Sequence, residues 1–283
     1  MSRRRPLLRA AAVGIAAALA LTGCASGAGS QTEPEAAGDG YVTAGTFTVA
    51  TGEPAYYPWV IDDDPESGEG FEAAVAYAVA EQLGFAEDDV VWVRTGFDEA
   101  IAPGPKNFDV NLQQFSITDE RREAVDFSSP YYETTQVVVT TGASPAADAS
   151  SIADLKGLLI GAQTGTTSFA AIENVIAPTQ GAQAFNTNDD AKLALENGQV
   201  DAIVLDLPTA FYISSEELTD GVLVGQLPEA EGTQGDAFGF VLAKDSPLTA
   251  EVSEALDELR DDGTLDELAA EWLGGEGQAP LLK

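Results

Sequence analysis

From residue 46 onward, short β-branched runs alternate with segments whose apolar residues recur at helical spacing. Strands are expected at residues 46–51 and 90–94, and a helix between them at 71–83 ends at Gly84. A third strand is expected at 108–112. Strands that alternate with helices form parallel sheets, so this order predicts an α/β fold.

A second unit of the same kind follows the first. A β-branched run at 136–141 leaves the first unit, and further strands are expected at 158–162 and 200–205. Between these two strands, Asn188 is expected to cap a helix at 189–196. The second unit is therefore also predicted to be an α/β layer structure.

The chain then returns to the first unit through a strand at 238–243 and two terminal helices. The last helix is predicted to open with a capping box at 264–267. We therefore expect two parallel-sheet lobes joined by two crossover hinge segments, near residues 133–137 and 233–237. The expected boundaries are 41–133 and 235–275 for lobe 1, 134–234 for lobe 2, and 276–283 for a C-terminal tail. Ligands bind such sheets at the carboxyl ends of the strands, so a site is expected between the lobes.

Residues 1–23 have the pattern of a secretory signal peptide. Arginines near the start precede an apolar run at 10–21, which is shorter than the roughly 20 residues that span a bilayer. Leu-Thr-Gly-Cys at 21–24 fits the lipobox pattern, so we expect cleavage before Cys24 and acylation of its sulfur. Residues 4–9 also loosely resemble a twin-arginine signal, so two export routes stay open.

Cys24 is the single cysteine, so no intrachain disulfide can form and the fold depends on its hydrophobic core. Residues 24–40 contain no aliphatic side chain larger than alanine, and we expect them to form a disordered tether. Two acyl chains on Cys24 would hold the protein to the membrane for long periods. The predicted location is therefore extracytoplasmic, with a lipid anchor in the outer face of the cell membrane.

Charge and composition exclude several classes of function. The chain carries 13 Lys and Arg against 47 Asp and Glu, a net charge of −34, and it contains no histidine. Such acidity excludes nucleic acid as a partner. Without histidine, serine-histidine and cysteine-histidine catalysis and the usual zinc sites are excluded. The acidic loop at 62–66 lacks the spacing of an EF-hand, so we favour a solvated loop and expect no metal and no cofactor.

One arginine lies among hydroxyl side chains in the stretch Ser-Ile-Thr-Asp-Glu-Arg at 116–121, which leads into Val-Asp-Phe-Ser-Ser-Pro-Tyr-Tyr at 125–132. The planar guanidinium of Arg121 matches a carboxylate with two parallel donors. Taken alone, Arg121 is also compatible with a solvated helix residue. The wider pattern resembles the signature of the family 3 extracellular solute-binding proteins, from about Thr46 to Gly274.

This resemblance implies a two-lobed, periplasmic-binding-protein-like fold of type II. It also implies the receptor of a polar amino-acid ABC importer. Such a receptor closes its lobes around one free amino acid and delivers it to a membrane complex of permease and ATPase. No covalent chemistry is required, and we expect a monomer.

An α-amino acid carries a carboxylate and an ammonium two bonds apart, so a receptor needs donors for one and an anion for the other. We expect Arg121 and the backbone N–H groups of Thr166 and Thr167 to hold the carboxylate. Asp206 directly follows the buried run at 200–205 and is expected to pair with the ammonium. The resemblance implies these same roles for the arginine, the hydroxyl-rich turns and the aspartate.

Other interpretations of these residues stay open. Asp206 precedes Pro208 by two residues, which is also a good helix start, and the threonines can act as an ordinary N-cap. The resemblance adds a hydroxyl contact from Ser116.

Selectivity for the ligand's side chain is expected to come from the first lobe. Within the resemblance, Tyr56 falls on an aromatic that stacks over the ligand, and Phe97 on the apolar residue facing it. Core packing is the alternative for each aromatic. Glu53 falls where relatives place an acid against a cationic or amide side chain, although a solvated carboxylate fits equally. A polar or basic amino acid is therefore favoured.

Three glutamines depart from the family pattern. Gln113 and Gln114 stand where small residues are usual, and Gln163 replaces residues that can reach the ligand. These amides are expected to shrink the pocket or to add hydrogen bonds to the ligand's side chain. We therefore include Gln114 among the predicted binding residues.

Two other classes of function remain as alternatives. Cyclohexadienyl dehydratases share this fold and need a pocket carboxyl as general acid, for which Glu53 and Glu173 are candidates. A ligand-binding module of a signalling receptor is the other alternative, although no transmembrane segment is expected after Lys283.

Overall fold

The computed structural model describes residues 40–228, 236–274 and 279–283. The predictions for the signal peptide, Cys24 and the tether up to residue 39 lie outside the described residues. Within these three segments, no helix is both long and apolar enough to pass through a bilayer. All described residues belong to one contact unit, residues 36–283.

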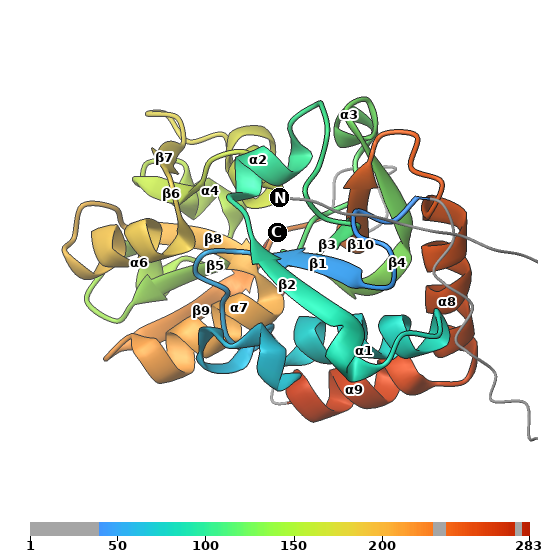
Figure 1. Cartoon of the computed structure of the whole chain (residues 1–283). Helices are drawn as coiled ribbons and strands as arrows, with labels where there is room; N and C mark the ends of the chain where they lie inside the picture. Colours follow the sequence, from blue (N-terminus) through green and yellow to red (C-terminus); the bar gives the residue numbers. More distant parts are fainter. Residues whose placement is uncertain (1–39, 229–235, 275–278) are drawn as a thin grey trace, which may run out of the picture. The chain divides into compact units, whose positions relative to one another are not determined.

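The first lobe is built on a five-stranded sheet with the order β2-β1-β3-β10-β4 (Figure 1). The strands are β1 (Phe47–Thr51), β2 (Val90–Arg94), β3 (Val110–Asn111), β4 (Val125–Thr134) and β10 (Asp236–Ala243). Every residue of β1 is buried, because this inner strand has a neighbouring strand on each side and helices pack on the sheet. Both β2 and β3 pair with β1 in parallel.

The helices of the first lobe are α1 (Phe71–Gln82), α2 (Phe97–Ile101), α3 (Asp119–Arg122), α8 (Thr249–Asp261) and α9 (Thr264–Trp272). Short 3₁₀ turns lie at Ile61–Asp63, Pro65–Ser67 and Glu87–Asp89. Helices α1, α8 and α9 contribute to one core with the sheet, in which Phe47, Phe71 and Phe238 are fully buried. Each such side chain contributes about 1.5–3 kcal/mol of stability on burial.

The second lobe has its own five-stranded sheet with the order β7-β6-β8-β5-β9. The strands are β5 (Gln136–Thr141), β6 (Ile160–Gln163), β7 (Gln183–Phe185), β8 (Ala202–Asp206) and β9 (Gly221–Gln226). The helices are α4 (Ile152–Leu155), α5 (Thr167–Ala171), α6 (Asn188–Glu196) and α7 (Leu207–Tyr212), with a 3₁₀ turn at Pro145–Asp148. Helices α5 and α7 continue directly into π-helical turns at Ile172–Ile176 and Ile213–Glu217.

The two-lobed α/β fold is confirmed, and each sheet is mixed rather than wholly parallel. Strands β6, β7 and β8 run parallel, whereas β5 runs antiparallel to both β8 and β9. The cause is the crossover: Gln136, the first residue of β5, pairs with Asp206, the last residue of β8. Strand β10 is antiparallel to β3 and β4 in the first lobe.

Two connections between strands lead from one sheet to the other, and their described ends lie next to each other. The first runs from Thr134, the end of β4, to Gln136, the start of β5. The second runs from β9 to β10 and includes residues outside the described ranges; where β10 begins, Asp236 pairs with Thr134. The chain's last residues pack on the second lobe, because Leu281 forms a bridge with Gln226. The predicted lobe boundaries stay predictions.

Two predicted helix starts are wrong by one residue. Thr187, not Asn188, is the N-cap of α6, because it has extended backbone angles and its Oγ1 accepts a hydrogen bond from Asp190 N at 3.0 Å. The predicted capping box of α9 is absent from the described helix start, where Gly263 is the N-cap with φ +90°. A glycine adopts this left-handed angle freely, so the tight α8–α9 link places Thr264 inside the helix.

Contacts between the lobes include a buried aromatic junction. Trp59, in the loop after β1, has no exposed surface, and its Nε1 donates to Thr209 Oγ1 of α7 at 2.9 Å. Beside it, the rings of Tyr57 and Tyr212 lie 4.1 Å apart between centroids. The loop that follows β1 is therefore held against the helix that follows β8.

Candidate functional site

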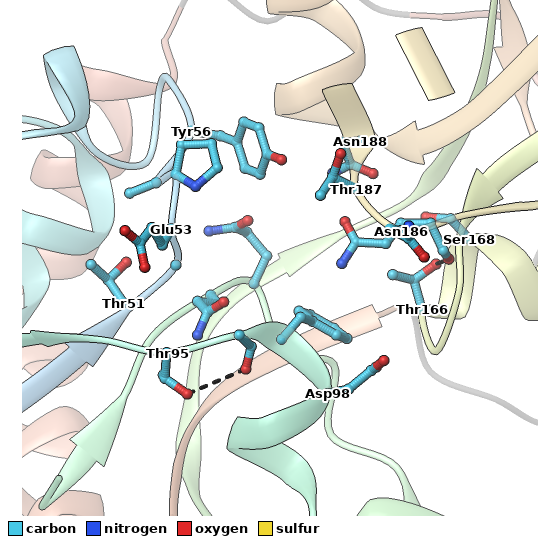
Figure 2. A pocket seen from close by; sticks show the side chains of 18 of the residues that line it. Thr51, Glu53, Tyr56, Thr95, Asp98, Thr166, Ser168, Asn186, Thr187 and Asn188 are labelled. Carbon is cyan, nitrogen blue, oxygen red and sulfur yellow. Dashed lines mark hydrogen bonds between the residues drawn. The ribbon is translucent and has the colours of Figure 1, made fainter. Parts of the chain in front are cut away.

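A cavity of about 270 Å³ lies at the carboxyl ends of the parallel strands of both sheets (Figure 2). Thr51 and Asp206, which end β1 and β8, are among its lining residues. This is the place where α/β sheets bind ligands. The structure brings all nine predicted ligand-binding residues into the lining: Glu53, Tyr56, Phe97, Gln114, Ser116 and Arg121 from the first lobe, and Thr166, Thr167 and Asp206 from the second.

Arg121 is a buried cation that contacts both lobes. Thr118 caps α3 through its Oγ1, which accepts from Arg121 N at 3.1 Å and fixes the start of this short helix. The guanidinium donates from Nη1 to Ser116 O at 2.7 Å and from Nη2 to Gly165 O at 2.9 Å. Its carbon Cζ lies 5.4 Å from the ring centre of Phe97.

Burial lowers the pKa of Arg121, and four carboxylates, led by Asp236, act in the opposite direction. Arginine keeps its charge in proteins, so the cavity contains a permanent cation with 9% of the residue exposed. Two of its five N–H groups are accounted for by the carbonyl oxygens named above, which leaves donors for an anion in the cavity. The solvated-helix interpretation of Arg121 is therefore wrong.

The hydroxyl groups of the cavity have distinct partners. Thr166 is the N-cap of α5, and its Oγ1 accepts from Phe169 N at 3.1 Å and donates to Gln163 O at 2.7 Å. Thr167 Oγ1 lies 3.1 Å from Ser116 Oγ of the other lobe. The N-cap alternative therefore holds for Thr166, whose hydroxyl is engaged within its own turn, while Ser116 and Thr167 meet across the cavity.

Asp206 is linked to a second carboxylate that the sequence analysis does not identify. Its Oδ1 accepts from Gln136 Nε2 at 2.7 Å, and the same nitrogen donates to Asp236 Oδ2. The side-chain oxygen Oε1 of Gln136 in turn accepts from Ser168 Oγ at 2.6 Å. Asp206 occupies the N-cap position of α7 without a side-chain capping bond, so its carboxylate is turned to this network instead.

Burial raises the pKa of Asp206 to about 8, and the nearby Asp236 adds to the shift, while Gln136 and Arg121 oppose it. A carboxyl in this setting takes up a proton readily and becomes a strong partner for a cation that replaces the proton. Gln136 and Asp236 each begin the strand that follows a crossover. That position is the one sequence signal that could have identified them.

Two predicted aromatic residues, Tyr56 and Phe97, line the cavity. Figure 2 shows the Tyr56 ring directed toward Thr187 and Asn188 of the second lobe. Its hydroxyl is hydrogen-bonded to the Thr187 side chain and to the backbone N–H of Asp189, and burial raises its pKa to about 12. Phe97 stacks on Phe115 with centroids 4.5 Å apart, so it packs in the first lobe and lines the cavity at once.

The ionisable lining is mostly acidic. It contains the carboxyl groups of Glu53, Asp98, Glu99 and Asp206 and the guanidinium of Arg121. The sequence analysis identifies Glu53 and misses Asp98 and Glu99, although both directly follow the predicted Phe97.

In the described residues no group of three potential metal ligands is present. The loop considered for calcium instead pairs Asp63 with Arg94 at 2.5 Å.

Comparisons with known proteins agree with this geometry. Residues 48–275 match the family model described as bacterial extracellular solute-binding proteins, family 3. The "Probable histidine-binding protein" of Campylobacter jejuni is 32% identical over 228 residues, which cover 79% of this chain and 84% of the relative.

Two solved structures are similar in fold and sequence. An ancestral arginine-binding protein bound to arginine has a TM-score of 0.67 and 31% identity, covering 81% of this chain and 99% of the other. The ancestral amino acid-binding protein AncCDT-1, a precursor of cyclohexadienyl dehydratase, has a TM-score of 0.66 and 29% identity, covering 81% and 95%. This chain belongs to the bacterial extracellular solute-binding proteins of family 3.

Proposed function

We propose that this protein binds one free amino acid between its lobes and passes it to the permease and ATPase of an ABC importer. The observation that carries the proposal is the pairing of opposite charges across one cavity: Arg121 enters from the first lobe and Asp206 from the second. The two groups match the two poles of an α-amino acid. A ligand that satisfies both poles favours the closed arrangement of the lobes.

In this proposal the ligand carboxylate accepts from the free N–H groups of Arg121 and from the Ser116 and Thr167 hydroxyls that flank it. Charge-assisted hydrogen bonds of this kind contribute about 1.5–3 kcal/mol each. The ligand ammonium replaces the proton on Asp206. Because Gln136 donates to that carboxyl and to Asp236 from the same nitrogen, the ammonium position is fixed relative to the guanidinium.

The side chain of the ligand is proposed to be polar or basic. Once Asp206 is assigned to the ammonium, Glu53, Asp98 and Glu99 still line the cavity. These acids favour a cationic side chain between the aromatic walls of Tyr56 and Phe97. Two of the similar proteins are named for histidine and for arginine, which supports the same class.

Export and lipid anchoring belong to the proposal as well. They rest on the signal-peptide pattern and on Cys24 in its lipobox. The description of the family as extracellular agrees with export. We infer that the mature chain acts at the outer face of the membrane, where a tethered receptor stays close to its permease.

We also propose that the protein is not an enzyme. Of the two candidate acids for a dehydratase, Glu173 is engaged elsewhere, since it accepts from Ala182 N at 2.5 Å. Glu53 lines the cavity, so dehydratase activity is tested directly. Incubation with prephenate and arogenate should leave both compounds unchanged.

The function is tested by a thermal-shift screen of the twenty amino acids plus ornithine and citrulline, followed by calorimetry of the hits. A ligand that binds the native state alone raises the melting temperature. We expect a polar or basic L-amino acid to bind, and its decarboxylated and methyl-ester forms to fail. Equal binding of the decarboxylated amine would contradict the Arg121 assignment.

A further inference from the structure

Glu72 is a buried acid outside the cavity. It lies in the first turn of α1 with 1% of its surface exposed. Its Oε1 accepts from the backbone N–H of Gln114 at 2.7 Å and from the Tyr131 hydroxyl, and its Oε2 accepts from Gln114 Nε2. Two of the three donors therefore belong to one residue, and that residue lines the cavity.

Gln114 has an uncommon backbone conformation. Its φ is +51°, in the left-handed region that residues with a Cβ avoid at a cost of about 1 kcal/mol or more. The hydrogen bond from its backbone N–H to Glu72 stabilises this conformation. The bond from its Nε2 turns the amide nitrogen toward Glu72, so the carbonyl oxygen, on the other side of the same carbon, points away from the acid.

We propose that Glu72 is a positioning residue that sets amino-acid selectivity by making Gln114 present a hydrogen-bond acceptor to the ligand's side chain. The proposal rests on the proposed function, in which Arg121 and Asp206 hold the two poles of the ligand and the remaining lining faces its side chain. A carboxylate accepts hydrogen bonds and donates none, so it selects one orientation of the neighbouring amide. Ligands that end in N–H donors then gain a partner.

The burial of Glu72 is consistent with this role. Burial raises its pKa to about 7, while its bonds to Tyr131 and Gln114 oppose the shift. An acid retained at a site where burial disfavours its charge needs a compensating set of donors, and Gln114 supplies two of them. The gain to the protein is a pocket amide with one defined orientation.

The test uses Glu72→Gln in the full chain. An amide at position 72 has one acceptor oxygen, which the Gln114 backbone N–H occupies, and its nitrogen donates to the Gln114 carbonyl. The Gln114 amide then turns its nitrogen toward the cavity. We expect the affinity ratio of donor-ended ligands (L-arginine, L-histidine) to the acceptor-ended ligand L-glutamate to fall about tenfold, the effect of one hydrogen bond to a charged group.

Matched variants separate positioning from a structural effect. Glu81→Gln removes an exposed acid from the same helix and should leave the ratio unchanged. Gln114→Gly adopts positive φ without strain and removes the amide, so adding Glu72→Gln to it should change the ratio no further. A ratio within about twofold of wild type in folded Glu72→Gln, or a second drop in the glycine background, would overturn the proposal.

A second readout needs no ligand. The side-chain amide resonances of Gln114 should move in Glu72→Gln and stay in place in Glu81→Gln, because the first variant alone removes their carboxylate partner. Unmoved resonances overturn the positioning role by themselves.

If wild type binds no amino acid in the screen, the proposed function fails and the selectivity proposal fails with it. Binding with an unchanged affinity ratio overturns the selectivity proposal alone.

Discussion

Arg121 Nη2 donates a 2.9 Å hydrogen bond to the carbonyl oxygen of Gly165, which joins the two lobes at the edge of the cavity. The guanidinium that we assign to the ligand's carboxylate therefore also contacts the opposite lobe. In the proposed function, binding and closure share one side chain, because the ligand and Gly165 are assigned to different N–H groups of the same planar fork.

Arg121→Ala should weaken amino-acid binding about 100-fold or more, since loss of a buried charged partner costs about 3 kcal/mol or more. Calorimetry with the best ligand of the screen measures the change. Arg122→Ala is the matched control, because Arg122 follows in the same helix and packs over the Phe127 ring at 5.8 Å. Unchanged affinity in Arg121→Ala would refute the carboxylate assignment.

Glu53→Gln should weaken a cationic ligand about fivefold and leave a neutral one such as glutamine within about twofold, since a partly exposed ion pair contributes about 1 kcal/mol or less. The comparison is made by titration of both ligands. Glu66→Gln removes the same charge from a nearby exposed turn and should affect neither. Equal losses of affinity for both ligands would show that Glu53 does not distinguish a charged side chain from a neutral one.

Binding should become tighter as the pH rises from about 6 to about 8. The pKa of Asp206 in the free protein is raised to about 8, so below this pH the ammonium must displace a proton. The affinity should gain at most about tenfold per pH unit, which is about 1.4 kcal/mol. Calorimetry in buffers of different ionisation enthalpy should show proton release at pH 6.5 that Asp206→Asn abolishes.

The same raised pKa sets the sign of the pH effect on stability. The unfolded chain loses the Asp206 proton near pH 4, whereas the ligand-free native state keeps it to about pH 8. The native state binds more protons across this window, so its stability should fall as pH rises through it. Denaturant unfolding at pH 5 and pH 8 should show a smaller difference for Asp206→Asn than for wild type.

Gly165→Ala should weaken binding, because an added Cβ would meet Asp98 of the opposite lobe. A side chain at positive φ should also cost the fold about 1–2 kcal/mol of stability. Gly165 has φ +75°, and an added Cβ would lie 2.8 Å from Asp98 Oδ1. Gly157→Ala is the control, since a Cβ there meets no atom within 4 Å. Affinities equal to wild type in both variants would contradict a tight closure at this turn.

Local pattern predicted much of this fold. Periodicity placed β2 and β5 at their observed residues, because uninterrupted β-branched runs leave few alternatives. It did not predict β4, where Pro130 breaks the run. The sheet accommodates this proline opposite Gly239 with a register shift, a long-range pairing that no local pattern shows.

The candidate site, like the fold, could be predicted in part from the local sequence. Arg121 and Asp206 stand out locally, one within a hydroxyl-rich motif and the other at the end of a buried run. Gln136 and Glu72 act through partners 70 and 42 residues away, respectively. Their roles depend on which strands and helices become neighbours, so single-sequence reasoning could not find them.

Trp59 gives this molecule an internal optical reporter of lobe motion. Its indole is one of three in the chain, and its N–H partner lies in the opposite lobe. A rotation of the lobes that breaks this bond changes the surroundings of the indole and therefore its emission. Ligand-induced movement can thus be followed in solution by intrinsic fluorescence, without an attached dye.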